Sequence, residues 1–146
     1  MVDRMTISRV FTTASPKKGA RGDILLSVRA PVGEVCSASS DICLGRGVCA
    51  IQPKCVDKNF LYHALIALEP LWGRLSSGST FDSVNSEEIR RFSLLVPREI
   101  AEQAAVAAVL SDMDAELAEL QGKREKTALL KLGMMQALLT GRTRLM

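Results

Sequence analysis

The sequence predicts an α+β protein, in which a small twisted β-sheet lobe with one or two short helices precedes a long C-terminal α-helix. Short apolar segments separated by Gly and Pro turns fill residues 21–53 and predict the sheet. Apolar residues at intervals of three and four over residues 57–75 predict a helix. Residues 99–140 contain no proline and are rich in strong helix formers, which predicts the long helix. The chain therefore divides into two predicted domains, residues 1–98 and residues 99–146.

The β core is predicted from three segments. Residues 1–20 form an irregular lead-in that ends in a turn rich in Lys and Gly. Residues 24–30 are an apolar strand, and residues 34–39 are its hairpin partner across a Pro and Gly turn. The Gly-Arg-Gly sequence at residues 45–47 interrupts the next apolar segment, which is typical of a bulge or of a close backbone approach.

Short helices and a last strand complete the predicted lobe. Pro70 interrupts or kinks the helix of residues 57–75, because proline removes a helical hydrogen bond. A hydroxyl-rich loop at residues 76–80 ends that helix. A short helix is predicted at residues 86–91, and residues 92–96 are predicted to form the last strand.

The long helix is predicted to pair with another helix. At about 1.5 Å per residue it measures on the order of 60 Å, which is too long for the lobe to bury. Its apolar residues step by four and three, the period of a coiled coil. A one-residue slip near Gly122 gives an alternative distal face, because the period then shifts. That face contains Leu129, Leu132, Gln136 and Leu139. The predicted dimer interface, called the seam below, consists of Val106, Leu110, Met113, Leu117, Leu120, Met134 and Leu138.

Charge along the helix predicts how two copies pair. Residues 99–121 carry six acidic side chains and no basic one, whereas residues 122–146 carry six basic side chains and one acidic one. Antiparallel copies would set Glu116 and Glu119 near three basic residues of the partner copy, Lys123, Arg124 and Lys126. Parallel copies would set like charges side by side. We therefore expect an antiparallel coiled coil. Complementing the helix macrodipole is a second explanation of the same polarity.

Several classes of protein are disfavoured by the sequence. No apolar run reaches the roughly 18 residues of a membrane span, and no secretion signal opens the chain, so we expect a cytoplasmic protein without membrane contact. The spacing of Cys36, Cys43, Cys49 and Cys55 matches no usual zinc site, so we expect reduced thiols and no metal. His63 has no nucleophile motif near it, so we expect neither a catalytic residue nor a cofactor.

Basic residues concentrate in the first predicted domain. Residues 1–98 carry thirteen Lys or Arg and nine Asp or Glu, whereas residues 99–146 carry six and seven. DNA phosphates take Lys, Arg and hydroxyl side chains, and Arg also reads bases. The candidate DNA-binding residues are therefore Lys17, Lys18, Arg21, Arg46, Ser77, Ser79 and Thr80. Each group also has a structural interpretation, as a solvated turn, a bulge around Arg46 or a loop that ends a helix.

The chain resembles a known family over roughly residues 20–146. The motifs that carry this resemblance are GDILLSVRAPVGEV, CLGRGVCAI, FLYHALIAL, GSTFDSVNSEEIRRFSLLVP, EQAAVAAVLSDMDAELAEL and LLKLGMMQALLTGRTRL. In their order and spacing they resemble the specificity subunit of type I restriction-modification systems. The ending LLTGRTRL is the most telling motif, because neither packing nor helix capping requires it.

The resemblance implies a non-catalytic protein that reads double-stranded DNA. Such a subunit contains two target-recognition domains, each followed by a long helix, and its two helices pack antiparallel. It holds methyltransferase (modification) subunits, and the restriction subunit joins indirectly. This chain contains one recognition segment, shortened on its N-terminal side, and one helix. The resemblance therefore implies a half-subunit whose antiparallel homodimer would rebuild the complete device.

Two further functions remain as alternatives to DNA recognition. The chain could be an interaction module whose helix pairs with another specificity or methyltransferase subunit, while its lobe contributes no DNA readout. An independent nuclease is the third hypothesis. It is disfavoured because no acidic pair with an adjacent lysine occurs in a strand and turn context.

Overall fold

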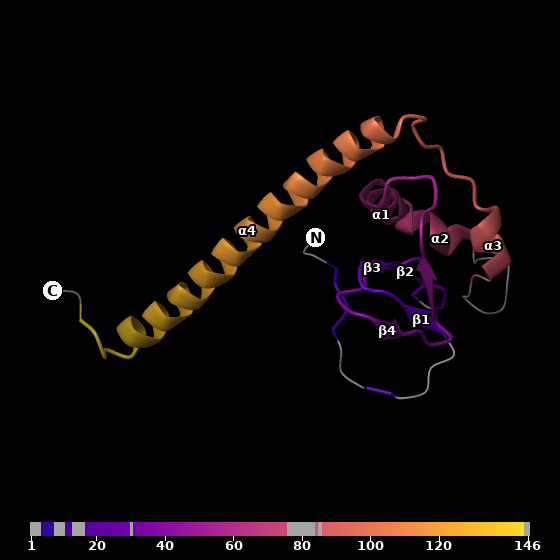
Figure 1. Cartoon of the computed structure of the whole chain (residues 1–146). Coiled ribbons are helices and arrows are strands. Elements are labelled where there is room, and N and C mark those ends of the chain that lie inside the picture. The colour runs from indigo at the N-terminus through magenta and orange to yellow at the C-terminus, as the bar shows by residue number, and fades with distance from the viewer. Residues whose placement is uncertain are drawn as a thin grey trace. The chain divides into compact units, whose positions relative to one another are not determined.

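The computed structural model of the chain describes residues 4–7, 11–12, 17–29, 31–75, 84 and 86–144. It contains two compact units. One unit extends from Arg4 to Ser111 and holds the strands and the short helices, and the other begins at Asp112. A long helix, α4 (Ile100–Leu139), contributes to both units. The predicted combination of small sheets, short helices and one long helix is confirmed (Figure 1).

The described strands form two small antiparallel sheets. They are β1 (Lys18–Gly19), β2 (Ile24–Ser27), β3 (Val35–Ser37), β4 (Ile42–Cys43) and β5 (Val48–Ile51). One sheet has the order β3-β2-β5, and the other pairs β1 with β4. The predicted hairpin of residues 24–39 is confirmed as β2 and β3, with Leu25 opposite Cys36. Gly33 in its turn has φ 92°, a conformation that glycine adopts without steric cost.

The short helices follow the sheets in the sequence. They are α1 (Lys58–Ala67), α2 (Glu69–Leu75) and α3 (Ser86–Arg91). Asp57 caps α1, because its side chain accepts a hydrogen bond from the Phe60 backbone N–H at 2.9 Å. The predicted interruption near Pro70 is confirmed, since α1 ends at Ala67 and α2 begins at Glu69.

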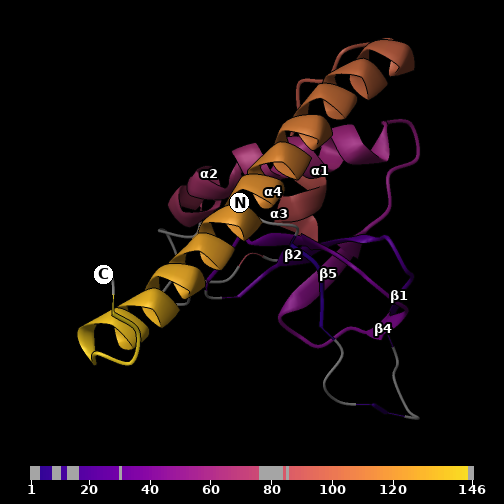
Figure 2. The same ribbon diagram turned by 90° about the vertical axis from the view of Figure 1, so that its left-hand side faces the viewer.

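The main core lies between the β3-β2-β5 sheet and the helices α1 and α2 (Figure 2). Ile24, Leu26 and Val35 project from the sheet and pack with Leu65 and Trp72 from the helices. Strand residues alternate between faces, so Leu25 and its cross-strand neighbour Ala50 face the other way. The β1–β4 sheet lies against that second face, where Gly19 approaches Ala50. The predicted twisted-sheet lobe is therefore layered, with helices on one face and a two-stranded sheet on the other.

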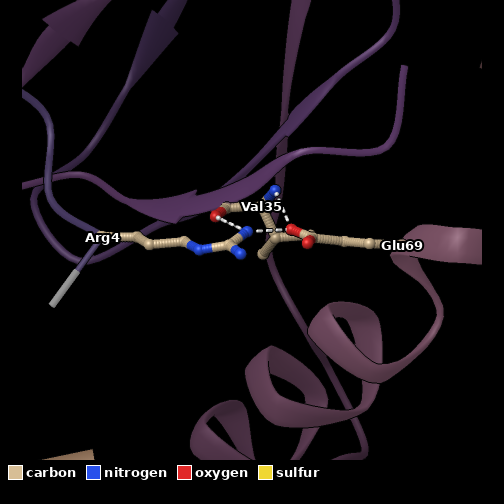
Figure 3. A network of polar contacts seen from close by, with 3 residues as sticks. All are labelled: Arg4, Val35 and Glu69. Atoms are coloured by element: carbon tan, nitrogen blue, oxygen red, sulfur yellow. Dashed lines mark hydrogen bonds and ion pairs between the residues drawn. The ribbon is translucent and has the colours of Figure 1, made fainter. Parts of the chain in front are cut away.

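The N-terminal segment is attached to the edge of the sheet (Figure 3). Met5 forms a parallel bridge with Ser37 in β3. Arg4 forms an ion pair with Glu69, the first residue of α2, and Glu69 Oε1 accepts a hydrogen bond from the Val35 backbone N–H at 2.9 Å. Arg4 also donates to the Val35 carbonyl oxygen at 3.5 Å. This network links the N-terminal segment, β3 and α2.

Two predictions about backbone structure were wrong. Residues 92–96 were predicted to form a strand, but they form none in the structure. Their aromatic residue instead packs on the helices, with the Phe92 and Trp72 ring centroids 4.7 Å apart, while Leu95 is fully exposed. The prediction of a bulge at residues 45–47 was wrong, because these residues lie in the turn between β4 and β5. The other alternative, a close backbone approach, is found at Gly47, whose carbonyl oxygen accepts a hydrogen bond from the Val28 N–H at 2.9 Å.

Candidate nucleic-acid interface

An open hollow lies beside the outer face of β5. Its volume is about 380 Å³. It is lined by Lys17, Lys18, Leu44, Val48, Cys49, Ala50 and Gln52. The pairing of β1 with β4 brings the two ends of the hollow's lining together. A hydrogen bond of 2.9 Å from the Leu44 N–H to the Lys17 carbonyl oxygen extends this pairing. Two of the predicted DNA-binding residues, Lys17 and Lys18, are thus brought together beside an apolar wall.

The predicted residue Arg46 lies in the turn between two residues that line the hollow, Leu44 and Val48. Its side chain is exposed. Arg29 accompanies it, because a Cβ built on Gly47 would lie 3.8 Å from the Arg29 Cβ and 3.9 Å from its Cδ. Within the described part of the chain, neither arginine forms an ion pair. Two arginines are therefore added to the two lysines on this side of the lobe.

The predicted residue Arg21 occupies a different place. It lies in the turn between β1 and β2, and its backbone N–H donates to Asp41 Oδ1 at 2.9 Å. The neighbouring Gly22 approaches the ammonium group of Lys58, at the start of α1. Arg21 does not line the hollow.

The remaining predicted DNA-binding residues were Ser77, Ser79 and Thr80. They lie outside the described residues. The structure therefore adds nothing to the prediction that this hydroxyl-rich loop holds a phosphate.

Burial keeps two of the thiols in the neutral form. Burial raises the pKa of the Cys49 thiol, which packs against the main core, although backbone hydrogen bonds oppose this effect. Burial, followed by the nearby Glu34 carboxylate, also raises the pKa of Cys36. At neutral pH both side chains therefore act as small apolar groups and not as nucleophilic thiolates. Cys43 and Cys55 are exposed.

The first turns of α4 are packed within the lobe through one side of the helix. Gln103 is 1% exposed, and its Oε1 accepts a hydrogen bond from the Asp57 N–H while its Nε2 donates to the Pro97 carbonyl oxygen, both at 2.7 Å. Ala107 is also buried, and Ser111 Oγ lies 3.1 Å from His63 Nε2. Residues spaced by four lie on one side of a helix. This side of α4 therefore belongs to the lobe as far as Ser111.

The seam predicted on α4 occupies a different side of the helix and is exposed. Its residues other than Leu138 are between 38% and 56% exposed, and Leu138 is half-buried. At about 100° per residue, the seam lies roughly a quarter of the circumference away from Gln103 and Ala107. Apolar side chains so exposed on one helix are typical of a surface that binds a partner. Packing of the first turns in the lobe therefore leaves the seam accessible.

Charged residues near the middle of α4 pair within the helix. Lys123 Nζ lies 2.6 Å from Glu119 Oε1, and both side chains are 67% exposed. An exposed pair at this spacing contributes about 0.3–0.5 kcal/mol, so it is weak enough to exchange partners. The last residue of α4 is Leu139, and Gly141, with φ 70°, turns the chain away from the helix. The Thr143 N–H donates a hydrogen bond to the Ala137 carbonyl oxygen at 3.0 Å, as at other helix ends that carry a glycine.

Two kinds of site were sought among the described residues. None of their helices has both the length and the apolar character that crossing a bilayer requires. The same residues contain no group of three His, Cys, Asp or Glu side chains arranged to hold a metal ion.

The sequence analysis missed two residues, Gln103, which joins α4 to the lobe, and Arg29, which lies beside Gly47. Gln103 was missed because a glutamine in an Ala-rich helix has no pattern that distinguishes a buried side chain from an exposed one. Arg29 was missed because its proximity to Gly47 depends on the pairing of β2 with β5, which are far apart in the sequence. Of the arginines on this side of the lobe, only Arg46 could be singled out from the sequence, because glycines flank it and often mark a turn.

Comparison with known proteins identifies similar sequences. Residues 12–129 match the family described as type I restriction modification DNA specificity domain. The chain is 34% identical, over 125 residues, to a protein of Methanocaldococcus jannaschii described as a candidate type I restriction enzyme MjaX specificity subunit. This similarity covers 84% of the chain and 29% of that relative.

Two solved structures are similar in fold. One was determined in a study of complex assembly and conformational transition of the type I R-M system, and it shares 29% sequence identity with a TM-score of 0.77. The aligned region covers 91% of this chain and 33% of the chain in that structure. The other is the crystal structure of the HsdS subunit from Thermoanaerobacter tengcongensis, with 29% identity, a TM-score of 0.68 and coverage of 83% and 29%. The chain thus spans about a third of the length of these relatives.

Proposed function

Because the chain belongs to the family of type I restriction modification DNA specificity domains, we propose that it recognises a DNA sequence and positions modification subunits there. A specificity domain is a non-catalytic component of such a system. The observation that carries the proposal is the extent of the family match, residues 12–129, which includes both the β lobe and most of α4. In this proposal residues 1–98 contact DNA and residues 99–146 pair with another helix.

The DNA contacts are proposed on the side of the lobe that carries the hollow. Lys17, Lys18 and Arg46 are exposed there, and Arg21 would contact DNA from the neighbouring turn. Lysines supply point charges for phosphates, whereas arginine can also donate two parallel hydrogen bonds to a guanine. Ser77, Ser79 and Thr80 stay part of the proposal as further phosphate contacts.

The proposed assembly is an antiparallel homodimer through α4. Support comes from the exposed seam and from the charge distribution, acidic before residue 122 and basic after it. In an antiparallel pair the Glu119 carboxylate would exchange its exposed bond with Lys123 for a lysine of the second copy. Each such pair is worth about 0–1 kcal/mol, so charge sets the direction of the helices while the apolar seam supplies affinity.

Modification subunits are proposed as the second protein partner. A dimer with two lobes would present a split DNA sequence and hold one modification subunit for each half. The restriction subunit would join through the modification subunits and not through this chain. Under this proposal the chain has no cofactor and no catalytic residue of its own.

A gel-shift experiment tests DNA recognition. The full chain is mixed with random-sequence duplex DNA at low salt, alone and with its modification subunits. We expect binding that weakens steeply as salt rises, because neutralised phosphates release counterions. Absence of binding in both mixtures would reject DNA recognition. If the modification subunits are nevertheless retained, the alternative is supported, in which the chain is an assembly module without DNA readout.

The seam is tested by the double substitution Leu110→Glu and Leu117→Glu. Fully burying one leucine is worth about 1.5–3 kcal/mol, and a symmetric dimer would lose four of them. We expect the dimer to become a monomer in analytical sedimentation. Leu130→Glu is the matched control, because Leu130 is 64% exposed on α4 but belongs neither to the seam nor to the distal face. An unchanged mass in the double variant would show that the helices pair elsewhere.

A further inference from the structure

We propose that the hollow beside β5 is a seat for the sugar-phosphate backbone of one DNA strand, so that it anchors DNA without reading its sequence. This inference rests on the proposed function and concerns the division of work within the lobe. It assigns Lys17 and Lys18 to phosphate oxygens, and it assigns the apolar wall to the carbon atoms of deoxyribose.

The charge of the hollow favours an anion. Lys17 and Lys18 line it, and none of the other described residues that line it is acidic. The Asp23 carboxylate, which is 7% exposed, is linked to the hollow through Gln52. Its Oδ2 accepts hydrogen bonds from the Ala20 N–H at 2.9 Å and from Gln52 Nε2 at 2.8 Å. Both donors belong to the lobe, and Asp23 itself is not among the residues that line the hollow.

The walls of the hollow favour a ligand that is partly apolar. Leu44, Val48 and Ala50 line it beside Lys17, Lys18 and Gln52, so its surface is partly apolar and partly polar. Inorganic phosphate would leave these carbon atoms in water, whereas deoxyribose would cover them. A sugar-phosphate unit therefore matches both the charge and the walls.

The hollow is poorly equipped to read bases. Base recognition depends on forked groups that form two hydrogen bonds with one base edge. Gln52 is the one amide among the residues that line the hollow, and its Nε2 already donates to Asp23. Lysine is a flexible point charge that does not impose the geometry of a base edge. Sequence readout is therefore left to groups outside the hollow, such as Arg46 in the turn before β5 and Arg29 beside Gly47.

The test measures binding of the full chain to two 30-base-pair duplexes of unrelated sequence at several sodium chloride concentrations, by fluorescence anisotropy. The variants are Lys17→Gln and Lys18→Gln, with Lys54→Gln as the control. Lys54 is exposed and is not among the residues that line the hollow, so it matches the loss of charge without the site. The fluorescence of Trp72, the single tryptophan, confirms that each variant is folded.

We expect each hollow variant to bind about three- to tenfold more weakly near 0.1 M salt, equally on both duplexes. The salt slope of log affinity should fall by about 0.9 for each lost phosphate contact, and Lys54→Gln should change neither quantity. In the same chain, bound DNA should protect Lys17 and Lys18 from acetylation more than Lys54.

Three results would overturn the inference in different ways. Failure of the unaltered chain to bind either duplex would reject the proposed DNA recognition, and the inference with it. Binding that is retained in both hollow variants, with unchanged salt slopes, would reject the seat alone. Weakening on one duplex but not on the other would show that the hollow reads sequence.

Discussion

Replacement of Gln103 by alanine should unfold the lobe at a markedly lower urea concentration. In the native chain this side chain is 1% exposed and forms two hydrogen bonds of 2.7 Å with backbone groups of Asp57 and Pro97. The variant would leave both backbone groups without that partner in a partly buried region. A buried group that loses its hydrogen bond costs about 1–3 kcal/mol, so two groups together cost roughly 2–4 kcal/mol when partial access to water is considered.

The assay is urea unfolding followed by the fluorescence of Trp72, which is buried in the lobe. With a urea dependence of about 2 kcal/mol per M, the midpoint should fall by about 1–2 M. Glu125→Ala is the control, because Glu125 is exposed on the same helix and belongs neither to the seam nor to the distal face. It should change the free energy of unfolding by at most about 0.5 kcal/mol.

Hydrogen exchange provides a local measurement for the same variant. The Asp57 amide should exchange faster in Gln103→Ala, because its acceptor has been removed. Gln103→Glu should keep this acceptor but lose the donor to the Pro97 carbonyl oxygen, and should also place a carboxylate in a buried position. An unchanged midpoint together with an unchanged Asp57 exchange rate would refute the assignment of Gln103 as the link between α4 and the lobe.

Two other predictions concern the core and the thiols. Gly33→Ala should lower stability by about 2–4 kcal/mol in urea unfolding, because Gly33 has φ 92° and an added Cβ would lie 2.5 Å from the Trp72 Cβ; Gly45→Ala, where no atom lies within 4 Å, should be nearly neutral, and equal midpoints for the two variants would contradict this. In titration with a disulfide reagent at pH 8, Cys43 and Cys55 should react before Cys36 and Cys49, because burial raises the pKa of the latter two and reduces their thiolate fraction. Because the folded state holds the protons of Cys36 and Cys49 more tightly than the unfolded state does, this contribution to stability is present below the ordinary thiol pKa of 9.0 and should be lost as the pH rises above that value. Four equal rates of reaction with the disulfide reagent would argue against burial of these two thiols.

Local patterns in the sequence predicted much of the fold. The hairpin of β2 and β3 follows from apolar strands around a Gly turn, and the break between α1 and α2 follows from Pro70. The predicted strand at residues 92–96 was wrong, because an apolar segment can be used by packing on helices as well as by pairing in a sheet. Phe92 packs on the helices, where its ring contacts that of Trp72.

The candidate site was less predictable, because it depends on contacts between distant residues. The charge of Lys17 and Lys18 was evident, but their hollow requires β1 to pair with β4 across more than twenty intervening residues. Strands of two residues carry too little pattern to be detected in a single sequence. The seam on α4 was predictable because its period repeats along the helix, whereas the burial of Gln103 depends on two backbone groups from the lobe.

The link formed by Gln103 has a consequence for building chimeras with exchanged DNA specificity. A junction placed at residue 98 would separate Gln103 from the Asp57 and Pro97 backbone groups of its own lobe. Gln103 would then have to bond to the corresponding backbone groups of a lobe from another protein. A junction placed after Ser111 would transfer the lobe together with the helical turns that complete its packing. The lobe that folds as one unit would then include the first three turns of α4, and a graft that respects this boundary should keep its native stability.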